Sequence, residues 1–239
     1  GIGRVAARLP DAELGDDVVG AVLELLVPGE GEHAWHGGCL ALAELGRRGL
    51  LLPARLGDVV PAVTSALTYD VQRGTCSVGA NVRDAACYVC WAFARAYDPP
   101  VLHAHVSALA PAMMVAACYD REVNCRRAAS AAFQENVGRQ GADNFPSGIA
   151  ILTRADFFAL GSRTRAYLAV APFVAAQGPA YWPALAWHLL QHKLPHWDAA
   201  VRRLAARALA RLAPLRPQAV VEELLPWLLP RCLSPNLPT

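Results

Sequence analysis

The sequence predicts an all-α fold, a superhelical stack of about five or six helical pairs, on the basis of three observations. First, Arg127, Arg165 and Arg203 recur at intervals of 38 residues, each within an alanine-rich stretch. Second, apolar residues recur with a period of about 3.6, and no segment shows sustained alternation with a period of two. Third, clusters of glycine, proline and asparagine separate the periodic segments. Self-similarity at about 40 residues is typical of helical solenoids.

Each expected helix is an apolar-periodic segment between turn residues. The turn segments are 28–31, 98–100, 140–144, 177–179 and 214–217, all rich in glycine, proline or small polar residues. The expected helices cover residues 13–27, 33–48, 54–68, 79–97, 101–118, 121–137, 149–159, 163–176, 180–192, 197–213 and 217–231. Short joints between successive helices predict antiparallel neighbours, and repeated pairs of this kind build an extended surface for binding other proteins.

The order of three residue types refines this prediction. Pro111 precedes Asp120 by nine residues, and Asp120 precedes Arg126 by six. This order resembles the HEAT repeat, in which a proline bends the first helix, an aspartate lies in the turn and an arginine begins the second helix. The resemblance implies that Arg126, and Arg83 one repeat earlier, form hydrogen-bonded ladders between adjacent repeats. We therefore expect both arginines to be structural.

Two variations on this order are expected. Asp198 with Arg203 approximately repeats the aspartate–arginine pairing. Between Asp70 and Arg83 the spacing grows to thirteen, and the additional residues, 72–79, are expected to form a loop inside one repeat. Insertions in solenoids usually project from one side, often near the binding face, although a simple elongation explains the segment equally well.

Composition limits the classes of function. Hydrophobic residues make up 54% and charged residues 18% of the chain, which supplies a continuous core and excludes a disordered protein. A net charge of +2 gives no argument for nucleic-acid binding. Phosphate-binding loops and serine-nucleophile motifs are absent from the sequence, so we expect neither an enzyme nor a bound cofactor. The charge-free runs 99–119 and 166–192 are interpreted as buried helices rather than membrane spans.

Cysteine and histidine do not indicate a metal site. Cys87 and Cys90 lie in the middle of an expected helix, and a second such pair is absent, so they are interpreted as reduced, buried thiols of a cytosolic protein. His188, His192 and His196 are spaced to share one helix face, but a proline ends the expected helix before His196. We therefore expect no metal ligands here.

One face of the expected helix 121–137 is a candidate for partner binding. At about 100° per residue, Arg127, Ser130 and Gln134 fall within an arc of about 60°. This arc differs from the one that carries the apolar side chains, so the sequence predicts that these residues are accessible.

The same arc continues one repeat earlier. It carries Asp84, Cys87 and Trp91, with Arg95 next in line. Tryptophan and arginine dominate the energetics of protein interfaces, which makes Trp91 a candidate anchor. The alternative, that Trp91 packs against an adjacent repeat, is equally consistent with the sequence. Asp84, Trp91 and Arg95 are therefore candidates for partner contact, together with Arg127, Ser130 and Gln134.

Three blocks carry a more specific resemblance. They are residues 35–49, 81–97 and 124–141, and weaker collinear similarity continues to residue 209. Across essentially the whole chain, the sequence resembles the tubulin-folding cofactor D family. The resemblance implies a large cytosolic HEAT-repeat protein associated with the microtubule cytoskeleton and centrosome. Residues 1–239 are then expected to be a single solenoid segment, an internal section of a much longer chain.

The resemblance also implies partners and an activity. Members of the family receive β-tubulin after the cytosolic chaperonin and act with cofactors E and C and an Arf-like small GTPase. Together they promote assembly and disassembly of the α/β-tubulin heterodimer and contribute to activation of GTP hydrolysis. One alternative is an arginine such as Arg139 or Arg127 reaching a bound GTPase. Another is a structural spacer without direct tubulin contact.

Overall fold

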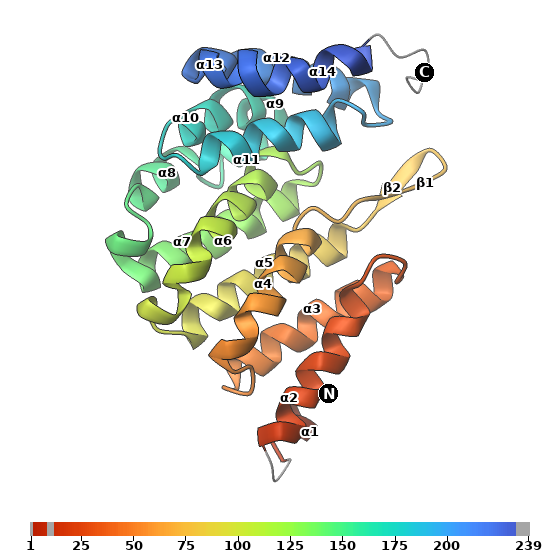
Figure 1. Ribbon diagram of the computed structural model, residues 1–239, viewed down its shortest axis with the longest axis vertical. Helices are drawn as coiled ribbons and strands as arrows, with labels where there is room; N and C mark the ends of the chain where they lie inside the picture. Colours follow the sequence, from red (N-terminus) through yellow and green to blue (C-terminus); the bar gives the residue numbers. More distant parts are fainter. Residues whose placement is uncertain (1, 9–11, 233–239) are drawn as a thin grey trace.

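The structure, a computed structural model, describes residues 2–8 and 12–232 and confirms the all-α superhelix (Figure 1). The predicted single solenoid runs over 1–239, of which residues 1, 9–11 and 233–239 lie outside the described part. Five helical pairs follow one another in the described residues. The number of pairs therefore agrees with the repeat length inferred from the arginine spacing.

Each pair consists of a first helix and an antiparallel second helix. The first helices are α2 (Ala12–Leu23), α4 (Leu56–Ala66), α6 (Pro99–Tyr119), α8 (Gly148–Arg154) and α11 (Tyr181–His188). The second helices are α3 (Glu32–Arg47), α5 (Ala80–Ala96), α7 (Val123–Asn144), α9 (Arg163–Arg165) with α10 (Ala171–Ala175), and α12 (Ala199–Leu212). Helix α1 (Ile2–Ala6) precedes the first pair, and α13 (Pro217–Ala219) and α14 (Leu225–Cys232) follow the last.

Short 3₁₀ and π-helical turns extend several of these helices. The 3₁₀ turns are η1 (Glu24–Leu26), η2 (Pro53–Arg55), η3 (Ala159–Gly161) and η6 (Ala213–Leu215). The π-helical turns η4 (Ala166–Val170), η5 (Leu189–Lys193) and η7 (Val220–Leu224) continue α9 into α10, extend α11 and join α13 to α14. Continuous helical segments over 163–175, 181–193 and 217–232 result, close to three of the expected helices.

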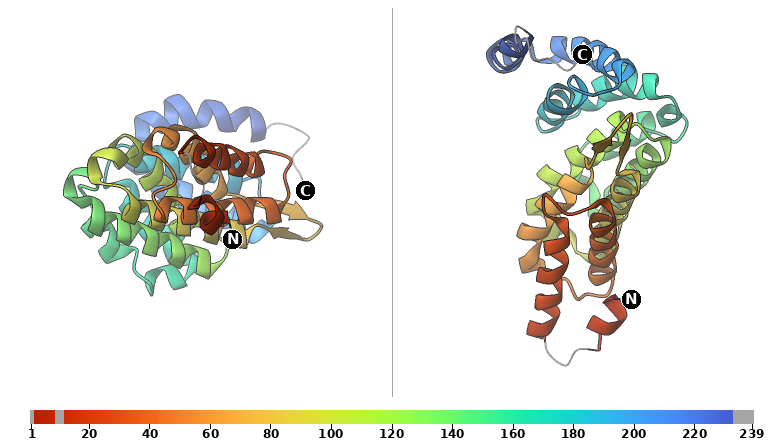
Figure 2. Two further views of the ribbon diagram at one scale, coloured as in Figure 1. Left: turned by 90° about the horizontal axis from the view of Figure 1, so that it is seen from below. Right: turned by 90° about the vertical axis from the view of Figure 1, so that its right-hand side faces the viewer.

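The helices form two layers. In the right-hand view of Figure 2, the first and second helices of the N-terminal pairs stand in two columns, and the C-terminal helices lean toward the column of first helices. Small side chains allow neighbouring helices to pack closely. Ala85, Ala86 and Ala92 of α5, for example, are all buried. Large aromatic side chains, among them Phe93 and Phe133, fill the space between the layers.

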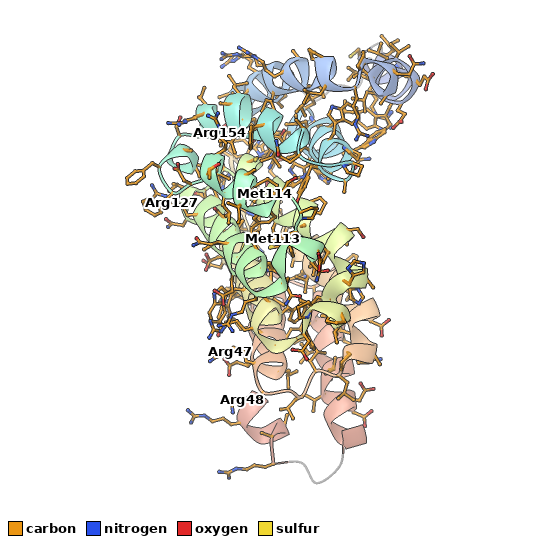
Figure 3. All side chains as sticks on the ribbon, turned by 90° about the vertical axis from the view of Figure 1, so that its left-hand side faces the viewer. Arg47, Arg48, Met113, Met114, Arg127 and Arg154 are labelled. Atoms are coloured by element: carbon orange, nitrogen blue, oxygen red, sulfur yellow. The ribbon has the colours of Figure 1, made fainter. Side chains whose placement is uncertain are left out.

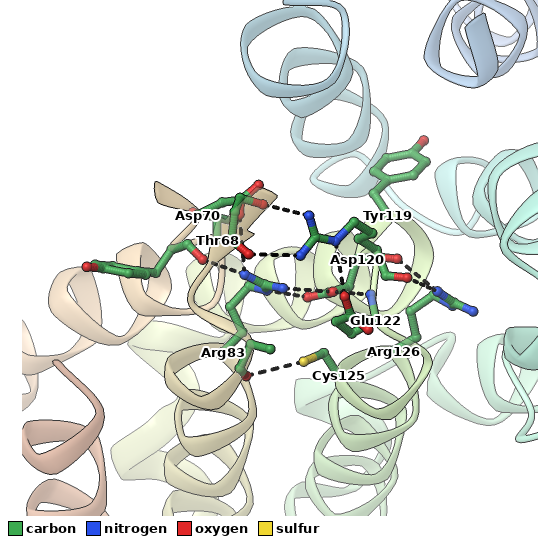
Figure 4. Close-up of polar contacts among 12 residues, drawn as sticks. Thr68, Asp70, Arg83, Tyr119, Asp120, Glu122, Cys125 and Arg126 are labelled. Atoms are coloured by element: carbon green, nitrogen blue, oxygen red, sulfur yellow. Dashed lines mark hydrogen bonds and ion pairs between the residues drawn. The ribbon is translucent and has the colours of Figure 1, made fainter. Parts of the chain in front are cut away.

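A buried ion pair joins the second repeat to the third (Figure 4). Arg83, at the start of α5, donates from Nε to Oδ2 of Asp120 at 2.6 Å and from Nη2 to Oδ1 at 3.2 Å. Its Nη1 donates to the carbonyl oxygen of Tyr69 at 2.7 Å. Asp120 also accepts from the backbone N–H of Glu122 at 2.8 Å. The charges are therefore paired and hydrogen-bonded, as burial requires.

Arg126 forms the equivalent link to the fourth repeat through carbonyl groups. Its Nη1 donates to the carbonyl oxygens of Asp120 and Arg121, both at 3.0 Å. Its Nε and Nη2 donate to those of Leu160 and Gly161 at 2.8 and 3.2 Å. Arg83 and Arg126 thus hold adjacent repeats together, which confirms the structural role predicted for them.

In the fifth repeat the predicted pairing of Asp198 with Arg203 is wrong. Arg202, not Arg203, donates to the turn carbonyls, those of His196 and Trp197, both at 2.9 Å. Asp198 caps α12 instead, because its Oδ1 accepts from the backbone N–H of Ala200 at 2.8 Å. Arg202 lies 76 residues after Arg126, which is twice the interval of 38. The predicted repeat length is therefore correct, but the arginine that bonds to the turn is one position earlier than predicted.

The short α8 brings non-adjacent repeats into contact. With only seven residues in α8, helix α11 packs directly on α6. His196 Nε2 then lies 3.6 Å from Oδ2 of Asp70, three repeats away. Arg121 donates to Oγ and to the carbonyl oxygen of Ser77 at 2.7 and 3.1 Å, and its Cζ lies 6.0 Å from the ring centre of Trp197. These contacts close the curved stack on one side.

The expected loop over 72–79 is instead an antiparallel hairpin of β1 (Val71–Arg73) and β2 (Cys76–Val78). Gly74 takes the positive φ of 62° that its turn requires. The sequence pattern did not reveal these strands because each is only three residues long and none of their side chains is buried. Hydrogen bonds from Arg121 to Ser77 anchor the hairpin to the third repeat.

Two expected helix ends are also wrong. Helix α7 continues past residue 137 to Asn144, with a break at Gly141 (φ 76°). Gln140 explains the extension, since its Nε2 donates to the carbonyl oxygens of Ala94 and Tyr97 and ties the helix to the preceding repeat. Helix α8 ends at Arg154 rather than 159, because Oδ1 of Asp156 accepts from the next backbone N–H groups and forms a turn.

Helix α6 is the one described helix that is long and apolar enough to cross a membrane. More than half of its apolar window is buried within the fold, as in the core helix of a soluble protein. Met113, Met114 and Ala117 are fully covered by neighbouring helices. Its apolar character is therefore accounted for by packing between α4, α7 and α11.

We predict that Asp120→Ala lowers the free energy of unfolding by about 3 kcal/mol, because the buried guanidinium of Arg83 loses its bidentate partner and keeps only the more distant carboxylate of Asp70, at 3.8 Å. Chemical denaturation followed by circular dichroism measures this change. Asp143→Ala, at an exposed carboxylate in α7, is the matched control and should change stability by less than about 0.5 kcal/mol. Equal effects of both substitutions would contradict the ladder.

The carboxylate of Asp70 makes the stability of the protein depend on pH in the acidic range. Burial alone raises the pKa of Asp70, but contacts with His196 and Ser77 and the charges of Arg83 and Lys193 outweigh it and lower the pKa to about 2. Because the folded-state pKa is depressed, the ionised carboxylate contributes stability above about pH 4, and this is lost as the pH falls toward 2.

Asp70→Asn should therefore cost about 1 kcal/mol at neutral pH, because solvent screens the contacts of this partly exposed carboxylate, and the difference from the unsubstituted protein should shrink between pH 4 and 2. Urea denaturation at a series of pH values measures it. A difference that stays constant over this interval would show that the charge of Asp70 contributes nothing.

Candidate partner-binding surface

Cysteine and histidine side chains lie where packing places them. Five of the seven cysteines, including Cys87 and Cys90, are buried, as expected. Burial raises the pKa of Cys90 to about 12, which keeps the thiol protonated at neutral pH. His188 stacks on a buried tyrosine, whereas His196 pairs with Asp70. Within the described residues, no group of three histidine, cysteine or acidic side chains is placed to hold a metal ion.

Trp91 lies on the partly exposed side of α5. It is half-buried and stacks on Tyr88 of the same helix with ring centres 5.7 Å apart and an interplanar angle of 16°. Arg95, one turn later in α5, places its Cζ 4.8 Å from the ring centre of Trp91. A tryptophan held between an aromatic ring and a guanidinium is fixed in orientation before any partner binds.

Ion pairs extend this surface onto both neighbouring repeats. Arg95 donates to Oε1 of Glu135 in α7 at 2.8 Å, and Arg139 donates to the same oxygen at 3.0 Å. On the other side, Arg47 of α3 donates to Tyr88 at 3.0 Å and to Glu44 at 2.7 Å. Arg47, Arg48 and Arg127 project to the same side of the molecule, on the left in Figure 3.

Sequence reasoning missed Tyr88, Glu135 and Arg47 as members of this surface. One signal pointed to them: Arg95 and Glu135 are 40 residues apart, and Arg47 and Tyr88 are 41 apart, close to one repeat. Residues one repeat apart meet across stacked helices, so complementary side chains at that interval are candidates for contact.

A shallow hollow of about 280 Å³ lies between α5 and α7. Asp84 and Trp91 line it on one side, and the small side chains of Ala128 and Ala131 line it on the other. Gln134 is exposed further along α7. The structure therefore brings Asp84, Trp91, Arg95, Gln134 and Arg139 onto one surface, which we call the α5–α7 face.

Arg127 occupies the edge of the α5–α7 face but points toward the turn after α8. Its Cζ lies 3.5 Å from the ring centre of Phe157, and its Nε donates to the carbonyl oxygen of Phe157 at 3.2 Å. Phe157 and the adjacent Phe158 are 57% and 83% exposed. These two phenylalanines, also missed by sequence reasoning, form an apolar projection next to a guanidinium, a combination common at interface hot spots.

Ser130 does not belong to the accessible surface, so the prediction that it contacts a partner is wrong. Its hydroxyl is buried and donates to the carbonyl oxygen of Ala155 at 2.7 Å. The bond satisfies a backbone group at the end of α8, which the short fourth repeat places against α7. The helical-wheel argument failed because it treats a helix as having one covered face, whereas α7 is covered by α5, α6 and α8.

The fold defines the class of protein: a helical-repeat solenoid, whose stacked second helices form one extended surface. Comparison with known proteins specifies the family. Residues 1–149 match the family model described as tubulin-specific chaperone D-like, ARM repeats. The chain belongs to this family.

Two curated relatives resemble nearly the whole chain. The tubulin-specific chaperone D of Dictyostelium discoideum is 43% identical over 239 residues, which cover 98% of this chain and 16% of the relative. The tubulin-folding cofactor D of Schizosaccharomyces pombe (strain 972 / ATCC 24843) is 27% identical over 232 residues, covering 91% and 20%. The chain thus spans less than a quarter of the length of either relative. No solved structure shows significant similarity to it.

We predict that Ser130→Ala lowers the free energy of unfolding by about 1 kcal/mol, because it leaves the carbonyl of Ala155 without its buried donor. Gln134→Ala, one turn later on an exposed position of α7, should leave stability within about 0.5 kcal/mol of the unsubstituted protein. Thermal and urea denaturation distinguish the two. A larger loss of stability in Gln134→Ala than in Ser130→Ala would contradict the buried hydrogen bond of Ser130.

Proposed function

We propose that this chain is a section of a tubulin-folding cofactor and binds β-tubulin through the α5–α7 face. The names of the relatives, tubulin-specific chaperone D and tubulin-folding cofactor D, support the tubulin-related role. The observation that carries the choice of surface is Trp91, which is half-buried between Tyr88 and Arg95 and lines the hollow between α5 and α7. The protein acts as a binding cofactor and not as an enzyme.

Differential binding is the proposed mechanism. A cofactor that holds one conformation of tubulin more tightly than another shifts the population by the ratio of the two affinities. A rigid surface suits this role, because ordering flexible side chains on binding would consume part of the interaction energy. The ring of Trp91 is already stacked and the guanidinium of Arg95 already paired in the free protein. They therefore favour a partner surface of matching shape.

The wider role follows the family. The protein acts in the cytoplasm, at the microtubule cytoskeleton and centrosome, with cofactors E and C and an Arf-like small GTPase. In this setting it promotes assembly and disassembly of the α/β-tubulin heterodimer and contributes to activation of GTP hydrolysis. An indirect contribution is favoured, since the guanidinium of Arg127 packs on Phe157 and that of Arg139 is paired with Glu135.

The alternative of a structural spacer is less consistent with the surface. A spacer needs only contacts between repeats, and Arg83 and Arg126 already supply these from the interior. It gives no reason for an aromatic and arginine-rich row on the exposed side of α5 and α7, nor for the exposed Phe157 and Phe158. Exposed aromatic side chains of this kind mark sites of protein contact.

We predict that Trp91→Ala in the full-length protein reduces capture of β-tubulin at least about tenfold, as expected for an interface anchor worth more than 1.4 kcal/mol. The matched control is Trp227→Ala, because Trp227 of α14 is also half-buried beneath an arginine, with Cζ of Arg231 3.7 Å from its ring centre. Titration of labelled β-tubulin measures both affinities.

Unchanged capture by Trp91→Ala would remove the α5–α7 face as the tubulin site. Equal losses in Trp91→Ala and Trp227→Ala would show a general effect of removing stacked tryptophans. Circular dichroism of each variant separates loss of binding from loss of fold.

A further inference from the structure

A groove of about 740 Å³ runs between the C-terminal part of α7 and helix α8. Its volume lies within the range of about 300–1,000 Å³ that is typical of ligand pockets. The groove has two chemically different ends. Its apolar wall includes Phe145, Ile149 and Leu152, and its polar end is formed by Arg95, Glu135 and Arg139.

The groove is open because α7 has glycine where it faces α8. A Cβ atom at Gly138 would meet nothing within 4 Å. Gly148, at the start of α8, packs so closely on Val137 that a Cβ there would lie 2.5 Å from it. One glycine therefore lets α8 approach α7, and the other leaves the space beside the helix unfilled. Gly138 and Gly141 both line the groove.

The apolar wall is accessible to a partner. Ile149, at the first turn of α8, is 74% exposed and lies on the rim of the groove. A large aliphatic side chain next to a hollow gains by burial about 25 cal/mol for each Å² of apolar surface removed from water. Together with Phe145 and Leu152, it offers a site for a large apolar side chain.

The polar end carries an excess of positive charge. Arg95 and Arg139 share the single carboxylate of Glu135, at 2.8 and 3.0 Å, so the three side chains have a net charge of +1. Both arginine side chains are more than 40% exposed, so they have N–H groups directed to solvent. Guanidinium groups bind carboxylates in paired geometry, which defines the charge of a complementary ligand.

We propose that this groove binds a protein segment in which a carboxylate side chain stands next to a large apolar side chain. The carboxylate pairs with Arg95 and Arg139, and the apolar side chain enters between Phe145, Ile149 and Leu152. The proposal goes beyond capture of β-tubulin, because it defines the ligand by chemistry. It rests on the proposed function only in treating the exposed side of α7 as protein-binding.

A short fluorescent peptide with adjacent glutamates followed by leucine and phenylalanine is the probe. Fluorescence anisotropy with the full-length protein should show saturable binding, weakened at least tenfold when lysine replaces the glutamates or alanine replaces the leucine and phenylalanine. Arg139→Glu should weaken binding of the glutamate peptide by a similar factor, because it reverses the charge at the polar end.

Gly138→Leu fills the groove without disturbing its walls, since Gly138 lies in regular helix and its Cβ direction is open. It should reduce peptide binding at least tenfold, whereas Gly138→Ala should retain it. Gly57→Leu is the control for adding leucine at an open helical glycine, because a Cβ at Gly57 in α4 also meets nothing within 4 Å. Thermal denaturation confirms that all three variants are folded.

Binding by Gly138→Leu equal to that of the unsubstituted protein would overturn the proposal, as would equal affinity for the glutamate and lysine peptides. Absence of saturable binding by the glutamate peptide would also overturn it. Capture of β-tubulin is measured on the same variants. If Trp91→Ala loses capture of β-tubulin but still binds the peptide, the result supports both the α5–α7 face as the tubulin site and the groove as the peptide site. If Trp91→Ala captures β-tubulin as well as the unsubstituted protein does, the result contradicts the proposed function and leaves the groove proposal unaffected.

Discussion

The buried pair of Arg83 and Asp120 is the interaction on which the stacking of the repeats depends. Two opposite charges in the interior are tolerable only if each is fully hydrogen-bonded, and here a carbonyl group of the second repeat and a backbone N–H of the third complete the set. All of these hydrogen bonds can form together only in one orientation of α5 relative to the turn after α6. Arg126 makes the corresponding link to the fourth repeat through carbonyl oxygens, so these two successive junctions are specified by directional bonds as well as by apolar packing.

The position of the exposed face follows from this internal constraint. Once the start of α5 is tied to the third repeat, α5 and α7 lie side by side along their length, and Arg95, about three turns after Arg83, meets Glu135. Trp91 is then held over the hollow between the two helices. The candidate surface and the ladder are consequently two sides of the same pair of helices: the inner side specifies the junction, and the outer side is left for contact with other proteins.

Several features of the site were accessible to sequence reasoning because they depend on periodicity. The repeat length placed Asp84, Trp91, Arg95 and Gln134 on one face, and it separated the ladder residues Arg83 and Arg126 from them. Ser130 was misassigned because its burial comes from α8, whose length the periodicity did not reveal. Phe157 and Phe158 were overlooked for the related reason that their exposure results from the turn that Asp156 forms when it stops α8.

The sequence by itself determined the all-α architecture, the repeat length and the family, because helical periodicity, turn residues and long blocks of similarity are all local along the chain. Only the tertiary structure decided how the repeats close on one another. The contact of Asp70 with His196 joins residues three repeats apart, and it exists because the short α8 allows α11 to reach α6. The groove beside Gly138 likewise depends on where α8 lies relative to α7. Distances of this kind are set by helix length and packing, and residue spacing does not encode them directly.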